Sequence, residues 1–360
     1  MYALPLTVAI LSLASAGAYS APRLSPPFDI QERRAAFGAP VTRFDCPTPP
    51  PPVRSLLFKG FYADAGQGSS IIDAKAKQDY DEAVRPISRF EKSISEFSDL
   101  YVRGLPPRAE AARCVQDWLF SWAKADALLG KASRQGGFVR KWSLAAVATS
   151  YLKVRDDPIL KTEKKAGVER WMVRWASVVK NDYSTGLNRE SRRNNHLYWA
   201  AWSVTAASVV LNDRKLFEWG IEGYRSALGQ IQEDGTLPLE LKRKSKALHY
   251  HVFSIAPLVL IAESGLRNAI DLYGEKDGVL HQLIRRSVEA LNSPDFFRHK
   301  TGRSQDWVGD LSGDKLAWME PYYARFPNAA IEKWVRRFRP LNNRYLGGDM
   351  TLLYGAAMPP

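Results

Sequence analysis

The chain has 360 residues with a hydrophobic fraction of 45%, which is enough to bury a sizeable core and excludes wholesale disorder. Lys and Arg number 51 against 38 Asp and Glu, so the formal net charge is +13, and eleven tryptophans accompany it. This combination favours an extended anionic ligand with flat apolar faces. The two cysteines exclude a disulfide-rich miniprotein and repeated four-ligand zinc modules.

An apolar run opens the chain. Residues 3–14 are apolar, and small residues follow at 14–16 and 18–20. The run is shorter than the roughly 20 residues that span a bilayer, and small residues are typical of signal-peptidase sites. We therefore predict a signal peptide over residues 1–20 and a periplasmic or secreted protein; the alternative is a buried N-terminal strand or helix. Because we find no later run of about 18 apolar residues, we expect no membrane contact.

Residues 21–54 are rich in proline and end near the run PTPPPP. This composition predicts an extended arm that cannot form a helix. Export permits a disulfide between Cys46 and Cys114, the two cysteines; the alternative is two separate buried thiols. Residues 58–73 hold three glycines and two serines among aromatic residues, which predicts a mobile loop.

From about residue 74 onward, apolar residues recur at spacings of three and four, which indicates helices. Turn residues such as Gly136-Gly137 and Asp234-Gly235 separate the periodic stretches. Alternating patterns typical of strands are scarce, so we predict an all-α domain over residues 55–360. The periodicity alone leaves a bundle and a toroid of helix pairs open. The clearest helical stretches are 137–153, 195–211, 215–231, 245–265, 279–292 and 328–338.

A first polar cluster lies at the start of one of these stretches. It reads SRRNNHLYW over residues 191–199. On a helix, Asn195, Trp199 and Trp202 share a face, with His196 beside them. An Asn N-cap followed by a core helix would explain one amide and the tryptophans. It would not explain the whole run of arginines, amides and histidine, so we treat the segment as a candidate site.

A second cluster, LKRKSKALHYH, covers residues 241–251. Arg243 and Tyr250 are seven residues apart, which places them on one helical face two turns apart. The alternative is a solvated basic face. His249 and His251 point away from each other on a helix, so we expect no metal site here, and the sequence carries none of the common metal or cofactor motifs.

These side chains suit one reaction. A 4-O-linked polyuronate can be broken without water, by removing the C5 proton and expelling O4. The neighbouring carboxylate must be neutralised, since negative charge spreads onto it in the transition state. Asn195, Arg243 and a protonated histidine provide that neutralisation. Tyr250 supplies the acid or base if nearby positive charge lowers its pKa. We expect no cofactor and no metal.

The same residues carry a family resemblance. The segment NNHLYWAAWSV at 194–204 resembles the NNHxYW segment of the mannuronate-type alginate lyases, polysaccharide lyase family 5. The segments GTLPLELKR at 235–243 and ALHYH at 247–251 resemble the family's second site segment. Further matches are residues 140–142, 317–322 and 346–349. The matches run in order from about residue 58 to 355.

The resemblance implies an incomplete (α/α) toroid of helical hairpins and β-elimination that gives a 4,5-unsaturated uronate end. It implies that Asn195 and Arg243 neutralise the substrate carboxylate and that His196 assists or acts as the base. Tyr250 becomes the acid, and also the base when the C5 proton and O4 lie on the same side. It also places Cys46 and Cys114 where the family has a disulfide.

The same resemblance supplies substrate-binding residues. Trp142 and Trp199 are expected along the sugar sites, Tyr62 in a lid over the groove, and Arg140 beside Trp142. Arg192 and His249 resemble the broad-specificity polyuronate lyases of the family. Two departures, Phe253 where relatives often carry Tyr and Tyr345 where they carry Arg, affect subsite contacts. Poly-β-mannuronate, polyglucuronate and hyaluronan therefore all stay open as substrates.

Three other functions were weighed. A binding protein without catalysis needs the tryptophans and arginines but not Tyr250 together with His196. A helical glycoside hydrolase needs a pair of carboxylates in its groove. A nucleic-acid-binding protein fits the charge, but neither export nor the sequence motifs favour it. We predict an anionic polysaccharide as the partner, no nucleic acid and a monomer.

Overall fold

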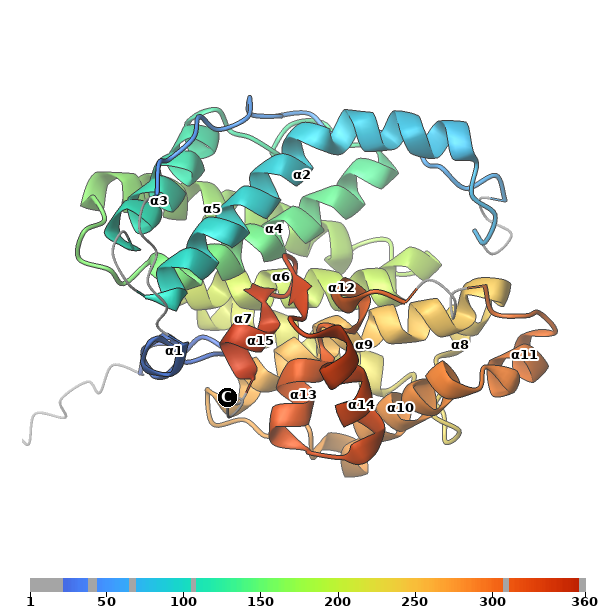
Figure 1. The fold of residues 1–360 in the computed structure, drawn as a ribbon. Helices are drawn as coiled ribbons and strands as arrows, with labels where there is room; N and C mark the ends of the chain where they lie inside the picture. The colour runs from blue at the N-terminus through green and yellow to red at the C-terminus, as the bar shows by residue number, and fades with distance from the viewer. Residues whose placement is uncertain (1–21, 38–43, 65–68, 105–107, 307–310, 356–360) are drawn as a thin grey trace, which may run out of the picture.

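The computed structural model describes residues 22–37, 44–64, 69–104, 108–306 and 311–355. The predicted signal peptide over residues 1–20 lies outside the described residues. Figure 1 shows a chain built almost wholly from helices, with the first long helices in one part of the molecule and the last ones in another.

The all-α prediction is confirmed. Within the described residues the strands are two short segments, β1 (Asn342–Asn343) and β2 (Gly348–Asp349), which pair antiparallel. The long helices are α2 (Ala74–Arg103), α3 (Arg108–Lys124), α4 (Arg134–Val154), α5 (Thr162–Ser184), α6 (Asn195–Leu211), α7 (Arg214–Leu228), α9 (Ala247–Leu266) and α10 (Glu275–Asn292). The short ones are α1 (Ile30–Phe37), α8 (Pro238–Leu241), α11 (Asp295–Thr301), α12 (Gly313–Leu316), α13 (Met319–Arg325), α14 (Ala329–Phe338) and α15 (Met350–Tyr354).

Side-chain caps explain where several helices begin. The side chain of the residue before each helix accepts a hydrogen bond from a backbone N–H of the first turn, which would otherwise lack a partner. This arrangement starts α2, α4, α6, α7 and α14 at the capping residues Asp73, Ser133, Asn194, Asp213 and Asn328. Short polar residues at these positions therefore set the helix register.

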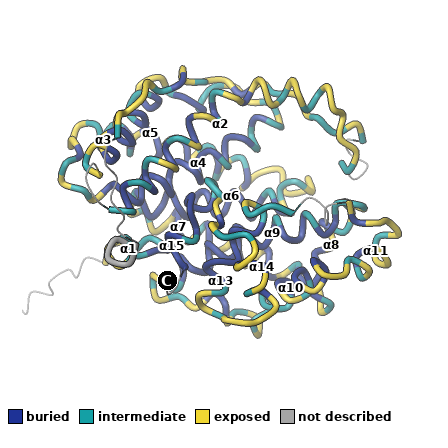
Figure 2. Tube along the Cα trace, in the orientation of Figure 1, coloured by how far each residue is buried: buried dark blue, intermediate teal, exposed yellow. Residues whose placement is uncertain are grey.

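Helices α4, α6 and α9 form the interior of the molecule. Their residues are nearly all buried, as the dark blue segments of Figure 2 show. Helix α6 packs against α4 and α5 on one side and against α7 and α9 on the other. Because α6 is apolar all round, it needs neighbours on every face. It therefore joins the earlier and later helices into one core.

Helix α9 corrects the expectation that no later apolar run exists. The stretch Lys244–Leu266 is long and apolar enough to cross a membrane by length and composition alone. However, 83% of its most apolar window is buried inside the protein. A helix that is apolar all round and enclosed by other helices is a core helix of the fold.

The proline-rich arm differs from its prediction. It contains helix α1, and it is not merely extended, because Leu24 and Phe28 are buried in the core. The sequence of α1 is free of proline, and the Asp29 side chain accepts hydrogen bonds from two N–H groups of its first turn. The prolines on either side of this stretch do not prevent a helix between them.

The second proline run is extended, as predicted. Proline lacks an N–H but keeps its carbonyl, which remains free to accept a hydrogen bond. Trp118 and Trp122, both buried, donate their indole N–H groups to the carbonyls of Pro47 and Pro50. These bonds fasten the run to helix α3 and lead the chain towards residue 56, where it pairs with the segment before α4.

The Cys46–Cys114 disulfide is confirmed, with the two Cα atoms 5.6 Å apart. It joins the arm to α3 across 68 positions of sequence. In the chain-entropy account, closing a loop of this size restricts the unfolded chain and stabilises the fold by about 4 kcal/mol.

Replacing both cysteines, as Cys46→Ser with Cys114→Ala, is expected to lower the free energy of unfolding by about 4 kcal/mol in urea titrations. Serine suits the exposed Cys46 and alanine the buried Cys114. Wild-type protein kept reduced with dithiothreitol is the control, because it loses the bond without any change of side chain. Equal unfolding midpoints for oxidised and reduced wild type would contradict the expectation.

Candidate functional site

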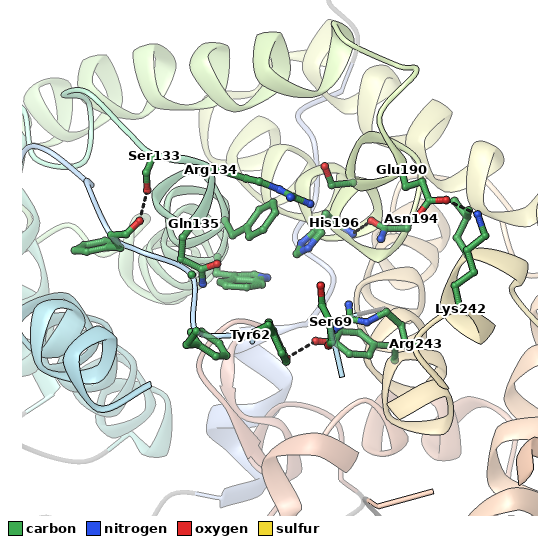
Figure 3. A pocket seen from close by; sticks show the side chains of 18 of the residues that line it. Tyr62, Ser69, Ser133, Arg134, Gln135, Glu190, Asn194, His196, Lys242 and Arg243 are labelled. Atoms are coloured by element: carbon green, nitrogen blue, oxygen red, sulfur yellow. Dashed lines mark hydrogen bonds and ion pairs between the residues drawn. The ribbon is translucent and has the colours of Figure 1, made fainter. Parts of the chain in front are cut away.

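A cavity of about 880 Å³ opens between the loop around Tyr62, the start of α4, the start of α6 and the turn before α9. Figure 3 shows Tyr62, His196 and Arg243 reaching this space from three segments far apart in sequence. Trp142 of α4 and Tyr250 of α9 complete this group. Five of the ten predicted site residues therefore line one cavity.

The start of α6 provides one wall. The Asn194 side chain accepts a hydrogen bond from the His196 backbone N–H at 3.1 Å and so caps the helix. His196 thus stands in the first turn, at the positive end of the helix dipole. A carboxylate placed at this end is stabilised by the dipole as well as by side chains.

Asn195 lies behind the cavity wall and is fully buried. Its side-chain nitrogen lies 3.0 Å from each carboxylate oxygen of Glu240, and its backbone N–H donates to the same carboxylate at 2.8 Å. Burial raises the pKa of Glu240, while its hydrogen bonds from Asn195 act in the opposite direction. The side-chain oxygen of Asn195 has no partner among the described residues. Contact between Asn195 and a bound carboxylate therefore requires a shift of this amide or of the ligand.

The second cluster is not one continuous helix, which corrects its prediction. The backbone turns at Lys244, whose φ of 54° lies in the left-handed region, and a 3-10 turn (Lys244–Lys246) precedes α9. Non-glycine residues visit that region rarely, and it interrupts a right-handed helix. Arg243 and Tyr250 still meet, with the guanidinium carbon 3.5 Å from the centre of the phenol ring.

The loop over the cavity touches the same pair. The hydroxyl groups of Tyr62 and Tyr250 lie 2.8 Å apart, in hydrogen-bond contact. Arg243 donates to the backbone carbonyl of Ser69 at 2.6 Å. The loop is a narrow hairpin held by pairing between Tyr62 and Ile72. Residues 65–68, within the predicted mobile loop, lie outside the described residues.

Burial decides the protonation states. It raises the pKa of Tyr250 well above the usual value of a phenol, against the opposing effect of Arg243. The expectation of a lowered tyrosine pKa is therefore not met in the unliganded site. Burial also lowers the pKa of His196 well below its usual value, and the charges of Lys141 and Arg243 add to this effect. The site thus holds a neutral phenol and a neutral imidazole at pH 7.

The cavity is basic and holds unused donors. Arg134, Lys242 and Lys244 line it with Arg243, whereas Glu190 is the one acidic side chain among the described residues that line it. The indole N–H of Trp142 and the Nε–H of Arg243 are buried and have no partner among the described residues. Because an unpaired buried donor is costly, these groups favour a ligand with anionic oxygens.

The sequence model of the alginate lyase family matches residues 61–297. The chain belongs to the alginate lyase family. An alginate lyase of Pseudomonas fluorescens strain SBW25 is 33% identical over 354 residues, which cover 96% of this chain and 93% of that protein. The chain is accordingly a polysaccharide lyase, as predicted.

Solved structures confirm the fold. Alginate lyase A1-III from Sphingomonas species A1 superposes with a TM-score of 0.79 at 29% identity, covering 91% of this chain and 95% of that one. The lyase therefore has the predicted (α/α) toroid of helical hairpins. A tyrosine-to-phenylalanine variant of A1-III, complexed with tetrasaccharide, gives a TM-score of 0.83 at 27% identity over 94% of this chain and 98% of that one.

Two predicted binding residues of the lyase line a neighbouring cavity. Arg140 and Arg192 border a space of about 540 Å³ that shares Arg134, Phe138 and Glu190 with the first one. Arg140 is buried and donates to the backbone carbonyls of residues 128 and 130, which leaves it little freedom to follow a ligand. Arg192 is half-buried and lies against the ring of Tyr183.

Trp199 and His249 lie outside both cavities. Trp199 is 1% exposed, and its indole N–H donates to the backbone carbonyl of Phe253. His249 packs its ring against Tyr250 and Phe253. Neither residue is therefore placed against a sugar site: Trp199 is buried, and His249 is half-buried beside Tyr250. Phe253, one of the two departures from the family, is the aromatic residue that joins them.

Three residues of the lyase site were missed by sequence reasoning. Phe138 stacks on the His196 ring with centroids 3.7 Å apart, and the Lys141 ammonium nitrogen lies 3.1 Å from His196 Nδ1. Glu240 holds Asn195. Glu240 and Lys141 both stand inside segments that resemble the family, but their contacts cross between elements and leave no periodic pattern.

Proposed function

We propose that this lyase cleaves 4-O-linked polyuronates by β-elimination and leaves a 4,5-unsaturated uronate end. Alginate and its poly-β-D-mannuronate blocks are the first choice, with polyglucuronate and hyaluronan as further substrates. The observation that carries the proposal is the convergence of His196, Arg243 and Tyr250 on one basic cavity. An alginate lyase complexed with tetrasaccharide shares the fold, which supports a chain of sugars as the ligand.

Neutralisation of the substrate carboxylate falls to Arg243 and the start of α6. The free Nε–H of Arg243 and the dipole of α6 offer positive character to the same ligand. Asn195 adds its amide N–H to the same carboxylate once that amide turns away from Glu240, which holds it behind the cavity wall. As the C5 proton leaves, negative charge grows on this carboxylate, so donors fixed around it lower the barrier.

Tyr250 protonates the leaving O4. Its raised pKa means that the phenol carries its proton when the substrate arrives, which is the form a general acid needs. The C5 proton goes either to a Tyr250 phenolate stabilised by Arg243 or to His196. In the first case Tyr250 first releases its own proton to solvent, then takes the C5 proton as a phenolate beside Arg243 and passes that proton to O4 on the same side of the sugar ring.

The polymer lies along the two connected cavities. Trp142 and Tyr62 contact sugar rings in the first cavity, and Arg192 binds a further carboxylate in the second. Arg140, Trp199 and His249 act in binding by supporting these contacts from behind. Aromatic faces and guanidinium groups suit a polymer that is both flat-sided and anionic.

A hydrolytic mechanism is disfavoured. Glycoside hydrolases place two carboxyl groups roughly 5–9.5 Å apart across the scissile bond. Glu190 is the one acidic side chain among the described residues of the cavity, and it forms an ion pair with Lys242. We further propose a monomer that acts in the periplasm or outside the cell on polysaccharide alone, without nucleic acid, membrane or cofactor.

Purified protein mixed with alginate, polymannuronate, polyglucuronate and hyaluronan, in the presence of a chelator, is expected to raise the ultraviolet absorbance of the new C4=C5 bond. The relative rates identify the substrate. New reducing ends without that absorbance would mean hydrolysis and would overturn the proposed reaction. Binding without either product would reduce the protein to a polysaccharide-binding member of the family.

A further inference from the structure

Lys141 on α4 is a fully buried lysine, and its Nζ lies 3.1 Å from Nδ1 of His196. Aromatic rings surround the rest of the amine. Nζ is 4.4 Å from the ring centres of both Phe138 and Trp142, and 5.5 Å from that of Tyr183. Phe138 also stacks on His196, so lysine, phenylalanine and imidazole form one compact unit behind the cavity.

A packing role does not account for this lysine. Burying an amine costs several kcal/mol unless its hydrogens are used, and a methionine would fill the same space without that cost. Lys153, another buried lysine among the described residues, pairs with the carboxylate of Asp99. In the described part of the chain, no carboxylate lies within ion-pair distance of Lys141, and its hydrogen bond goes to the imidazole instead.

The contact has a chemical consequence. In its ammonium form, Lys141 has three donors and no acceptor, so its hydrogen bond to the imidazole then uses the Nδ1 lone pair. The π faces of Phe138 and Trp142 favour the charged form of the amine. With Nδ1 accepting, a neutral imidazole must carry its hydrogen on Nε2.

We propose that Lys141 is a positioning residue that fixes His196 as the Nε2–H tautomer. His196 then faces the ligand as a hydrogen-bond donor to the carboxylate and not as the acceptor of the C5 proton. This inference rests on the proposed function, and it assigns the C5 proton to Tyr250, which must first release its phenolic proton to solvent and act as a phenolate beside Arg243.

Charged neighbours support the neutral state of the ring. Lys141 and Arg134 of α4, Arg192 before α6 and Arg243 before α9 all disfavour a second positive charge on His196. Burial is the largest influence and acts in the same direction. Burial, with a smaller effect of Arg192, lowers the pKa of Lys141 well below its usual value, whereas Asp182 of α5 acts in the opposite direction. The spectrum described below therefore also tests the charged form of the amine, because only the ammonium is restricted to donating. The imidazole therefore donates to the ligand as a neutral ring. Its tautomer determines which of the two ring nitrogens carries the hydrogen.

The test is a two-dimensional ¹⁵N–¹H spectrum of protein with ¹⁵N-labelled histidine, recorded without substrate near pH 7. His251 provides an internal standard, since its Nε2 accepts from the Leu237 N–H and its Nδ1 donates to the Ala247 carbonyl, each at 2.8 Å. We expect His196 to show Nε2–H and His251 to show Nδ1–H. The histidine signals that disappear in the spectrum of the His196→Gln variant are assigned to His196. An Nδ1–H tautomer at His196 in the wild type would overturn the proposal, whatever the variants do.

Activity gives a second readout. Lys141→Met keeps the apolar stem of the side chain but removes its N–H donors. We expect kcat to fall by roughly 100-fold while KM stays within about twofold of the wild type. The reason is that the oriented Nε2–H of His196 acts on charge that develops in the transition state. Lys141→Arg keeps a donor and should retain the tautomer. Unchanged kcat in a folded Lys141→Met would contradict the role. Because the spectrum needs no substrate, a protein that fails to cleave polyuronates would sink the proposed reaction without altering the tautomer result.

Discussion

We expect phenylalanine in place of Tyr250 to remove nearly all turnover while polymer binding survives. The change deletes a single oxygen, which is the proposed acid for O4 and the proposed acceptor of the C5 proton. General acid and base contributions are each worth about 10²–10⁴-fold, so kcat is expected to fall by at least about 10³-fold. Titration of the variant with an oligomannuronate, followed by tryptophan fluorescence, is expected to give an affinity within about threefold of the wild type, since the ring and Arg243 stay in place.

Tyr224→Phe is the matched control. Tyr224 of α7 is buried but does not line the cavity, and its hydroxyl donates to the backbone carbonyl of Leu272 at 2.7 Å. It should lose about 1 kcal/mol of stability, as is usual for a buried hydrogen bond, and keep its kcat. If Tyr250→Phe turned over at the wild-type rate, the assignment of Tyr250 would be wrong and the acid would have to be sought elsewhere in the cavity.

Alanine in place of Arg243 removes the group that stands against both Tyr250 and the predicted position of the carboxylate. We expect kcat/KM on polymannuronate to fall by about 10²–10³-fold, comparable with the loss of one donor from an oxyanion site. On methyl-esterified polymannuronate, which can undergo the same elimination without a charged carboxylate, the loss should be at least about tenfold smaller. The ratio of the two losses in kcat/KM separates the neutralisation of the carboxylate from a general loss of activity.

Two controls separate charge from shape. Arg243→Lys keeps the charge and should recover part of the activity, although lysine lacks the planar fork of donors. Arg225→Ala removes another arginine with carboxylate partners, on α7, and should leave both substrates unaffected. Equal losses on the charged and esterified polymers would show that Arg243 holds the loop through Ser69 and does not act on the carboxylate.

The local sequence was sufficient to predict those features that depend on a single helix or segment. The predicted helix at 195–211 coincides with α6, because an Asn cap and an apolar run specify both its start and its burial. The disulfide was predicted because the chain has two cysteines and we expected it to be exported. His196, Arg243 and Tyr250 were found because unusual polar residues stand at the ends of helices, where active sites are built.

Sequence reasoning failed where distant segments decide. Helix α1 forms within the proline-rich arm because Asp29 caps it and the core receives its neighbours Leu24 and Phe28. The bend at Lys244 is held by Gln305, which accepts from the Leu248 N–H and donates to the Lys244 carbonyl. The contacts of Lys141 and Glu240 likewise join separate helices. No periodicity within a single helix encodes such contacts.

The anchoring of the N-terminal arm bears on the order in which the chain can complete its fold. The backbone of Ser25 binds the side chain of Asn268, and the guanidinium of Arg33 binds the carbonyl of Gly355, 322 residues further along. Asn268 and Gly355 are synthesised long after the arm that they hold. The arm must therefore wait for these later residues before it can dock, while Cys46 and Cys114 can already join. The Cys46–Cys114 disulfide can thus form before the arm docks. Until the arm docks, this bond keeps it close to its final position.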